Sequence, residues 1–341
     1  MPGAIADVAV MAGVSKATAS RALSGNGYVS EETRGRVLRA AAELGYVPSP
    51  LAASLVTKRT KSIAIVSRFA SRWYFGEILE GIEAALLDRG YDLTLYNLHP
   101  DLPDRDRLFD YFLARKRLDG MIAIDIQAKP NEQARLSALG WPIVAVGGNL
   151  ANAHTMDIDD VELGRRATEH LIELGHRRIA HLTSAGADER PEAWSGRRLS
   201  GYLRAIDEAG LWTRVQMLST EHSLPSGYES GRQFLSANEG RPTAIFAATD
   251  EIAFGVILAA RELGIGVPDE LSVIGIDGHE YSSTFGLTTF EQRPHEQGIH
   301  AANILAQRIE DTPDDVSTRE TWPTRLILRG STAPPARTVS P

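Results

Sequence analysis

The sequence predicts an α/β protein with a small helical head and a larger core of doubly wound parallel sheets. The 341 residues are 43% hydrophobic and 23% charged, which is ordinary for a globular chain of two or three domains. Residues 1–60 have the apolar spacing of short helices. From residue 62 onward, short β-rich runs alternate with longer amphipathic runs, the pattern of parallel sheets covered by helices.

Three short helices are expected in the head. The first spans about 5–12 and ends at Gly13, because glycine readily takes the left-handed conformation that closes a helix. Ser15 can cap a second helix, 16–23, and Ser30 can cap a third. The inward residues of the third helix are predicted to be Val37, Leu38, Ala41 and Leu44.

A hinge helix and linker are predicted at 47–60. Ser49 can cap a helix that starts at Pro50 and ends near Val56. It spans less than about two turns, and such a helix is marginal in water unless something packs on it. The predicted domains are a head at 1–46, the linker, a core at 61–331 and a loose tail at 332–341. Within the core, the first lobe covers about 61–159 and 290–318, and the second about 160–289 and 319–331.

Strand and helix alternate along the core in two successive series. Because ligands of such sheets lie beyond the carboxyl ends of the strands, two facing lobes would form a binding cleft there. Predicted strands lie at 62–66, 92–96, 119–124, 142–146, 155–158, 178–182, 215–218, 243–248 and 272–276. Predicted helices lie at 75–89, 105–115, 131–139, 161–174, 195–208, 226–238 and 251–263.

Charge is distributed unevenly. The whole chain carries −8, but residues 1–60 carry +3 and the remainder −11, so only the head suits contact with phosphates. The absence of cysteine excludes disulfides, thiolate metal sites and cysteine nucleophiles, and fits a reducing cytoplasm. We expect neither a signal peptide nor a membrane span.

The first two helices have the spacing of a helix-turn-helix, with Lys16, Thr18, Ser20 and Arg21 on the solvent side of the second. A generic helical hairpin is the alternative. The basic charge of the head and the short helix after it favour DNA binding.

The stretch DVAVMAGVSKATASRALSGNGYVSEETRGRVLRAAAELGYVP resembles the head of the lactose-repressor/galactose-repressor (LacI/GalR) family of bacterial transcriptional regulators. YFGEILEGIEAAL, ATEHLIELGHRRIAHL, PTAIFAATDEIAFGVILAARELGIGVPDELSVIGID and LILRGSTAPP resemble later landmarks of that family. The resemblance implies a two-lobed core like that of periplasmic binding proteins. It further implies a cytoplasmic, nucleoid-associated repressor that binds near-palindromic operator DNA as a homodimer or tetramer. A small-molecule effector, often a sugar, would lie between the lobes.

The resemblance also places the DNA contacts. Arg21 falls at the position that commonly meets guanine, whose O6 and N7 accept from a guanidinium. Lys16 and Ala17 fall where the family varies its base readers, while Thr18 and Ser20 suit phosphates. Lys16 could instead be merely solvated. The expected DNA-binding residues are Ser15, Lys16, Ala17, Thr18, Ser20, Arg21 and Leu55.

Leu55 corresponds to the family's minor-groove wedge, an apolar side chain that inserts between base steps. A local contact within a linker helix is the alternative for this residue.

Two positions in the head and linker differ from the usual family pattern. Ala4 replaces a capping threonine, a loss of about 1 kcal/mol, and Pro50 stands where a polar residue is common.

The resemblance implies a set of effector contacts in the core. Arg198 and Asp277 match an arginine and an acid that hold the effector in relatives. Carboxylates and guanidinium groups pair with hydroxyls, and aromatic rings cover C–H faces, so the set suits a sugar. Ion pairs at the surface or between the lobes are the alternative. The expected effector-binding residues are Trp73, Asp125, Arg198, His222, Thr249, Asp250 and Asp277. Gly147 and Gly148 replace a polar pair that often contacts the effector.

Two other classes of function are weaker. A periplasmic sugar-binding protein would need a signal peptide and has no use for residues 1–60. For an enzyme we find no P-loop and no GxGxxG, HExxH or GxSxG motif, so we expect no catalysis and no cofactor. His170, His176 and His181 lie close in sequence, but packing roles fit them better than a metal site.

Overall fold

The computed structural model describes residues 4–24, 27–46, 59–98, 118–184, 193–236, 240–310 and 317–336. It divides into two compact units, residues 1–62 with 117–119 and the rest of the chain. The predicted hinge helix with Pro50 and Leu55, the predicted helix at 105–115 and the end of the tail lie outside the described residues.

The head contains the three predicted helices, α1 (Ile5–Met11), α2 (Lys16–Ser24) and α3 (Glu31–Glu43). The expected caps are present: the Thr18 amide donates to the Ser15 hydroxyl at 3.1 Å, and the Thr33 amide donates to that of Ser30 at 3.3 Å. Gly13 has a φ of +64°, which closes α1 as expected. The small core of the head consists of Val8, Ala9, Ala12, Ala19, Ala22, Val37, Ala40 and Ala41.

Two local expectations for the head need comment. Leu38 is 50% exposed rather than inward, because the buried stripe of α3 runs through Val37, Ala40 and Ala41, and Leu38 is rotated away from it. The capping side chain that Ala4 lacks is partly replaced, since the Ala4 amide donates to the Asp7 carboxylate at 2.8 Å.

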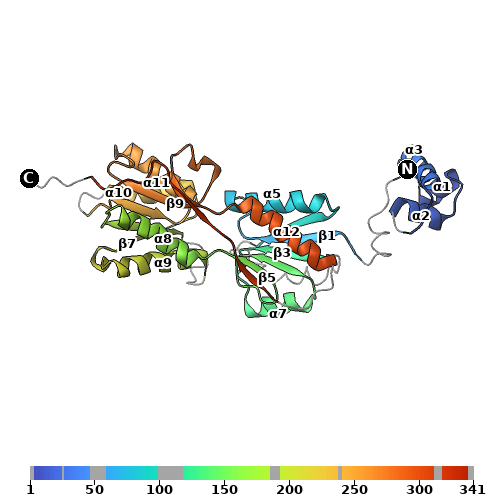
Figure 1. Ribbon diagram of the computed structural model, residues 1–341, viewed down its shortest axis with the longest axis horizontal. Helices are drawn as coiled ribbons and strands as arrows, with labels where there is room; N and C mark the ends of the chain where they lie inside the picture. The colour runs from blue at the N-terminus through green and yellow to red at the C-terminus, as the bar shows by residue number, and fades with distance from the viewer. Residues whose placement is uncertain are drawn as a thin grey trace, which may run out of the picture. The chain divides into compact units, whose positions relative to one another are not determined.

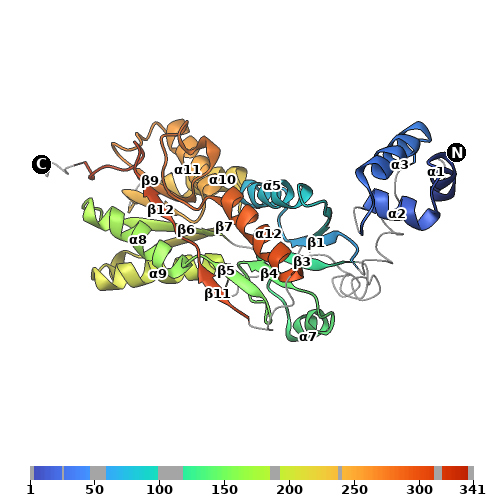
Figure 2. The same ribbon diagram turned by 45° about the vertical axis from the view of Figure 1, so that its right-hand side comes forward.

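The first lobe of the core is a six-stranded sheet in the order β11-β5-β4-β3-β1-β2. Its pairs β1–β3, β3–β4, β4–β5 and β5–β11 are parallel. Helices α5 and α12 lie together over one face and α7 lies on the other (Figures 1 and 2). The strands are β1 (Ser62–Ser67), β2 (Asp92–Asn97), β3 (Gly120–Ile124), β4 (Ile143–Val146), β5 (His154–Asp157) and β11 (Arg319–Thr321), and the helices are α5 (Trp73–Leu87), α7 (Pro130–Ala138) and α12 (Pro294–Glu310).

The second lobe repeats this plan in the order β12-β10-β9-β8-β6-β7. β12 is antiparallel to β10, and the other four neighbouring pairs are parallel. Alternate strand residues face opposite layers. Ile245 packs toward α10 and α11, whereas Phe246 packs toward α8 and α9. The strands are β6 (Ile179–Ser184), β7 (Gln216–Thr220), β8 (Ala244–Ala247), β9 (Ser272–Asp277), β10 (Thr288–Glu291) and β12 (Arg325–Ile327). The helices are α8 (Asp160–Glu173), α9 (Trp194–Glu208), α10 (Leu224–Leu235) and α11 (Asp250–Glu262), with short 3₁₀ turns at Trp212–Arg214 and Glu280–Ser282.

The chain passes between the lobes at places that differ slightly from the predicted boundaries. β10 lies in the second sheet, so the return to the first lobe comes after Glu291 rather than at 290. Residues 319–321 pair in parallel with β5 and so belong to the first lobe, not the second. Such a three-residue strand carries too little periodicity to assign from sequence.

Pairs of helices approach closely through reciprocal glycines. On α8 and α9, a Cβ on Gly164 would lie 2.1 Å from the Arg198 carbonyl oxygen, and one on Gly201 would lie 2.0 Å from that of Val161. Only glycine fits at such a backbone contact. This contact fixes the start of α9, which carries Arg198, against the start of α8.

Candidate functional site

The exposed face of α2 carries the side chains that the sequence singled out for DNA. Ser15, Lys16, Ala17, Ser20 and Arg21 are exposed. Thr18 is half-buried, and its hydroxyl shares a hydrogen bond with that of Ser15 at 2.9 Å.

Arg21 is held along its own helix, with Nε donating to the Ala17 carbonyl at 3.3 Å. The polar face of α2 is therefore presented by a packed three-helix unit, as base reading in a groove requires.

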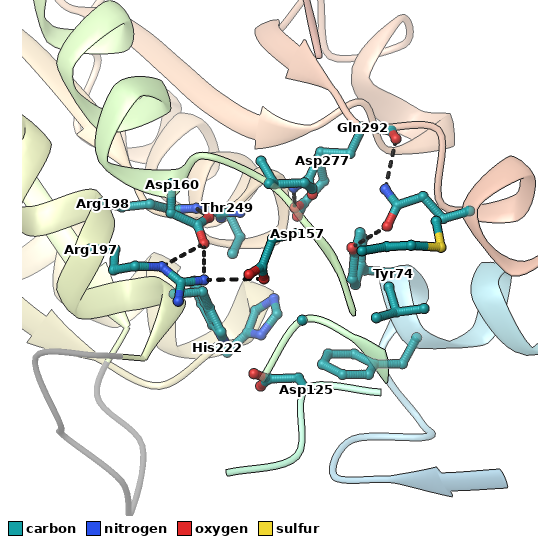
Figure 3. A pocket seen from close by; sticks show the side chains of 17 residues that line it. Tyr74, Asp125, Asp157, Asp160, Arg197, Arg198, His222, Thr249, Asp277 and Gln292 are labelled. Carbon is teal, nitrogen blue, oxygen red and sulfur yellow. Dashed lines mark hydrogen bonds and ion pairs between the residues drawn. The ribbon is translucent and has the colours of Figure 1, made fainter. Parts of the chain in front are cut away.

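A pocket lies within the core, and both lobes contribute to its walls. Figure 3 shows Asp125 and Tyr74 on one side of it, and Arg198, Thr249 and Asp277 on the other. Several of these groups follow the carboxyl ends of parallel strands, where doubly wound sheets bind ligands. The lining residues are Tyr74, Phe75, Asp125, Val146, Gly147, Met156, Asp157, Ile158, Asp160, Trp194, Arg197, Arg198, His222, Thr249, Asp277, Gln292 and Gln297.

Asp160 is the centre of an ion-pair cluster. One carboxylate oxygen accepts from Arg197 Nη2 at 2.7 Å and Nε at 3.2 Å, and the other accepts from Arg198 Nε at 2.9 Å. Arg198 also donates to the Ala248 carbonyl at 2.6 Å and lies over the Trp194 ring. Arg198 therefore lines the pocket as expected, but its guanidinium group is already engaged by the protein.

Acidic groups occupy the rest of the polar wall. Asp125 is paired with buried Arg68 at 3.4 Å, yet burial raises the pKa of Asp125 to about 6. Burial also raises the pKa of Asp157, whose carboxylate binds Arg319 at 2.8 Å. The wall is consequently rich in hydrogen-bond acceptors.

A chain of hydrogen bonds orders the side of the pocket near Asp277. Gln292 Nε2 donates to Asp277 at 2.8 Å, Gln297 Nε2 donates to the Gln292 carbonyl at 2.8 Å, and the Tyr74 hydroxyl donates to Gln297 at 3.0 Å. Burial and the nearby Asp250 carboxylate hold the pKa of Asp277 well above its usual range. Asp277 lines the pocket, as expected.

His222 and Thr249 also line the pocket, as expected. Burial, reinforced by two nearby arginines, lowers the pKa of His222 to about 3, so the ring is neutral at pH 7. Its Nε2 lies 3.3 Å from a Glu251 carboxylate oxygen, and within the described ranges its Nδ1 has no hydrogen-bond partner. That nitrogen is a buried polar atom whose hydrogen-bonding capacity is unsatisfied.

Asp250 does not line the pocket, contrary to expectation. It is fully buried and accepts four hydrogen bonds, from the Gly278 and His279 amides and from the Ser282 and Thr289 hydroxyls. Three of these donors bond Oδ2 and one bonds Oδ1, and they attach the start of α11 to the loop after β9 and to β10. Its role is to hold that loop, which follows Asp277.

Trp73 is not part of the lining either. It begins α5 in the first lobe and stacks on His279 of the second, with the ring centroids 4.4 Å apart. The side chain that enters the pocket is that of the next residue, Tyr74. One residue on a helix corresponds to a large rotation about its axis, which sequence matching alone did not resolve.

Gly148 has a structural reason to be glycine. A Cβ there would lie 2.5 Å from the Ile126 carbonyl oxygen, and φ is +88°. Its neighbour Gly147 lines the pocket.

Sequence reasoning missed most of the pocket's apolar and bridging groups. Asp157 lies near the end of the predicted strand 155–158 and Asp160 follows that strand, so their place at its carboxyl end was available as a signal. Gln292 and Gln297 follow a strand that was not predicted. The missed side chains are Tyr74, Phe75, Val146, Met156, Asp157, Ile158, Asp160, Trp194, Arg197, Gln292 and Gln297.

The three neighbouring histidines have separate packing partners. His170 contacts the Thr332 hydroxyl at 3.1 Å, His176 contacts Thr243 at 2.9 Å, and His181 stacks between Tyr202 and Phe246. Within the residues that the structure covers, no cluster of three or more metal-ligating side chains occurs, and no helix is long and apolar enough to cross a membrane.

Comparison with protein families gives two matches. Residues 4–49 match the family described as "Bacterial regulatory proteins, lacI family", and residues 168–332 match "Periplasmic binding protein-like domain". The HTH-type transcriptional repressor PurR of Pectobacterium atrosepticum is 38% identical over 336 residues, which cover 96% of each chain. PurR of Mannheimia succiniciproducens is 35% identical, over 96% of this chain and 98% of the relative.

Solved structures agree with these matches. The Lac repressor dimer bound to operator and the anti-inducer ONPF has a TM-score of 0.84 at 26% identity, covering 98% of this chain and all of the other. The complex of the transcriptional regulator CelR with cellobiose has a TM-score of 0.66 at 28% identity, covering 96% of this chain and 99% of the other.

Proposed function

This chain belongs to the lacI family of bacterial regulatory proteins, and we propose that its effector is a carbohydrate bound between the core lobes. As a member of that family it is a DNA-binding transcriptional regulator controlled by a small molecule. The observation that carries this proposal is a pocket walled by both lobes that combines acceptor-rich carboxylates with aromatic rings. Sugars present hydroxyl donors around their edge and C–H groups on their faces, which such walls match.

We propose that α2 reads the operator from the major groove. Arg21 would donate to guanine, Lys16 and Ala17 would face variable bases, and Ser15, Thr18 and Ser20 would bind phosphates. The exposure of these side chains on a packed helix supports the assignment. Leu55, which lies outside the described residues, would be the wedge in the minor groove.

Regulation would follow from a change in the angle between the lobes. An effector that contacts both walls favours the closed arrangement, and it shifts the equilibrium only if it binds the two arrangements unequally. In a homodimer this would move the two heads relative to each other on adjacent half-sites. The Lac repressor structure, a dimer on operator, supports a dimeric assembly here. The chain would act on DNA in the cytoplasm, binding its effector without transforming it.

Calorimetric titration of the full chain tests the proposed effector class. A panel of mono- and disaccharides should contain a sugar that binds once per chain, while nucleosides serve as the comparison class. Asp277→Asn should weaken that binding, because it alters a lining carboxyl while keeping its shape. Asp159→Asn, an exposed change at the cap of α8, should not. Saturable binding of a nucleoside and of no sugar would contradict the carbohydrate assignment.

A further inference from the structure

We propose that Asp160 sets the charge selectivity of the pocket by acting as a built-in anion on the guanidinium groups of Arg197 and Arg198. The inference rests on the proposed role of this pocket as the effector site, and it concerns which compounds the site admits. In its native form the pocket would take uncharged compounds rich in hydrogen-bond donors and would exclude phosphorylated or acidic ones.

The geometry around Asp160 is that of an anion site already filled. Its two oxygens receive three hydrogen bonds of 2.7–3.2 Å from Arg197 and Arg198, and Figure 3 shows the two from Arg197. Its side chain is 4% exposed and that of Arg198 is 5% exposed. Guanidinium groups bind ligand phosphates and carboxylates with the same fork of donors. Here a protein carboxylate takes that place.

The position of Asp160 on its helix also supports its role as a built-in anion. Asp160 is the first residue of α8, where unpaired amides and the helix dipole favour a negative group. The cluster therefore combines two guanidinium groups with a helix N-terminus. Without the carboxylate, these groups would form a strongly electropositive corner inside a pocket.

The opposite walls discourage an external anion. Asp125, Asp157 and Asp277 line the same pocket, and burial already raises the pKa of each, so additional negative charge would be unfavourable. A phosphate would have to displace Asp160 and then face these acids. A neutral ligand can use their acceptor oxygens without either cost.

Thermal denaturation of the full chain in inorganic phosphate, at ionic strength held constant with chloride, tests the inference. The native chain should show no saturable stabilisation. Asp160→Asn should be stabilised saturably, because phosphate takes the place of the charged carboxylate on the two guanidinium groups. Its apparent phosphate dissociation constant should be at least about tenfold below the highest concentration at which the native chain shows no saturation. Arg197→Gln added to Asp160→Asn should remove this response.

Asp159→Asn is the matched control, because it removes one negative charge at the neighbouring position and asparagine still caps a helix. It should behave like the native chain. Asp160→Ser provides a second test if the asparagine variant fails to fold. A phosphate response in the native chain, an equal response in Asp159→Asn, or none in either folded Asp160 variant would overturn the inference. Operator binding is measured separately, so failure of the regulator assignment would not be confused with these results.

Discussion

Replacing Gly164 by alanine should force α8 and α9 to separate. The new Cβ would lie 2.1 Å from the Arg198 carbonyl oxygen, whereas a comfortable carbon–oxygen contact is about 3.3 Å or more. The helices must separate by roughly 1 Å, and overpacking of this kind costs about 1–3 kcal/mol. The gain in helix propensity of about 1 kcal/mol offsets part of that cost. We therefore expect net destabilisation, together with displacement of Arg198 from Asp160.

Gly76 of α5 provides the matched control. A Cβ there would meet no atom within 4 Å, so Gly76→Ala should stabilise the chain by about 1 kcal/mol through helix propensity alone. Thermal denaturation followed by circular dichroism should give midpoints that move in opposite directions for the two alanine variants. Equal or same-sign shifts would refute the argument that the glycine contact is needed at this helix pair.

Three further predictions follow from the described geometry. Arg21→Ala should weaken binding to the operator by about 1–3 kcal/mol, and in an anisotropy titration it should lose preference for the guanine that Arg21 reads; unchanged preference would contradict that role. Trp73→Ala removes the stack on His279, an aromatic pair between the lobes that contributes about 0.5–1.5 kcal/mol. It should weaken effector binding although Trp73 does not line the pocket. An unaltered affinity for the effector would argue that this stack does not link the lobes. Burial lowers the pKa of His181 to about 4, so between about pH 6.5 and 4 the unfolded chain binds a proton that the folded chain does not. Because of this residue, the free energy of unfolding should decrease by about 3 kcal/mol as the pH is lowered through this range. Urea denaturation of His181→Gln should show a smaller decrease over the same range. An identical pH dependence in the two proteins would count against the assignment.

The helical head and most of the alternating core could be predicted because their periodicities are local. The caps at Ser15 and Ser30 and the exposed face with Arg21 follow from short-range rules of helix geometry. By contrast, β11 and β12 have three residues each, and their pairing with distant strands is decided by tertiary contacts.

The sequence predicted the region of the site better than it predicted which single side chains line the pocket. Five of the seven expected effector residues line the pocket, because strand ends in such sheets converge. The other two do not line it. The Trp73 ring stacks on His279 instead, and the Asp250 carboxylate accepts hydrogen bonds from the loop after β9. Asp160 was overlooked since its importance depends on meeting two arginines 37 and 38 positions away.

The most direct test of the account is fluorescence anisotropy of the native chain on DNA from its own upstream region, titrated with neutral mono- and disaccharides at fixed salt. We expect operator binding that weakens steeply with salt. We also expect one sugar to change the dissociation constant for operator at least about fivefold, the lower range of allosteric coupling. Salt-dependent operator binding that no neutral sugar alters would contradict the proposed effector class. Absence of any specific binding would contradict the assignment of α2 as the operator reader.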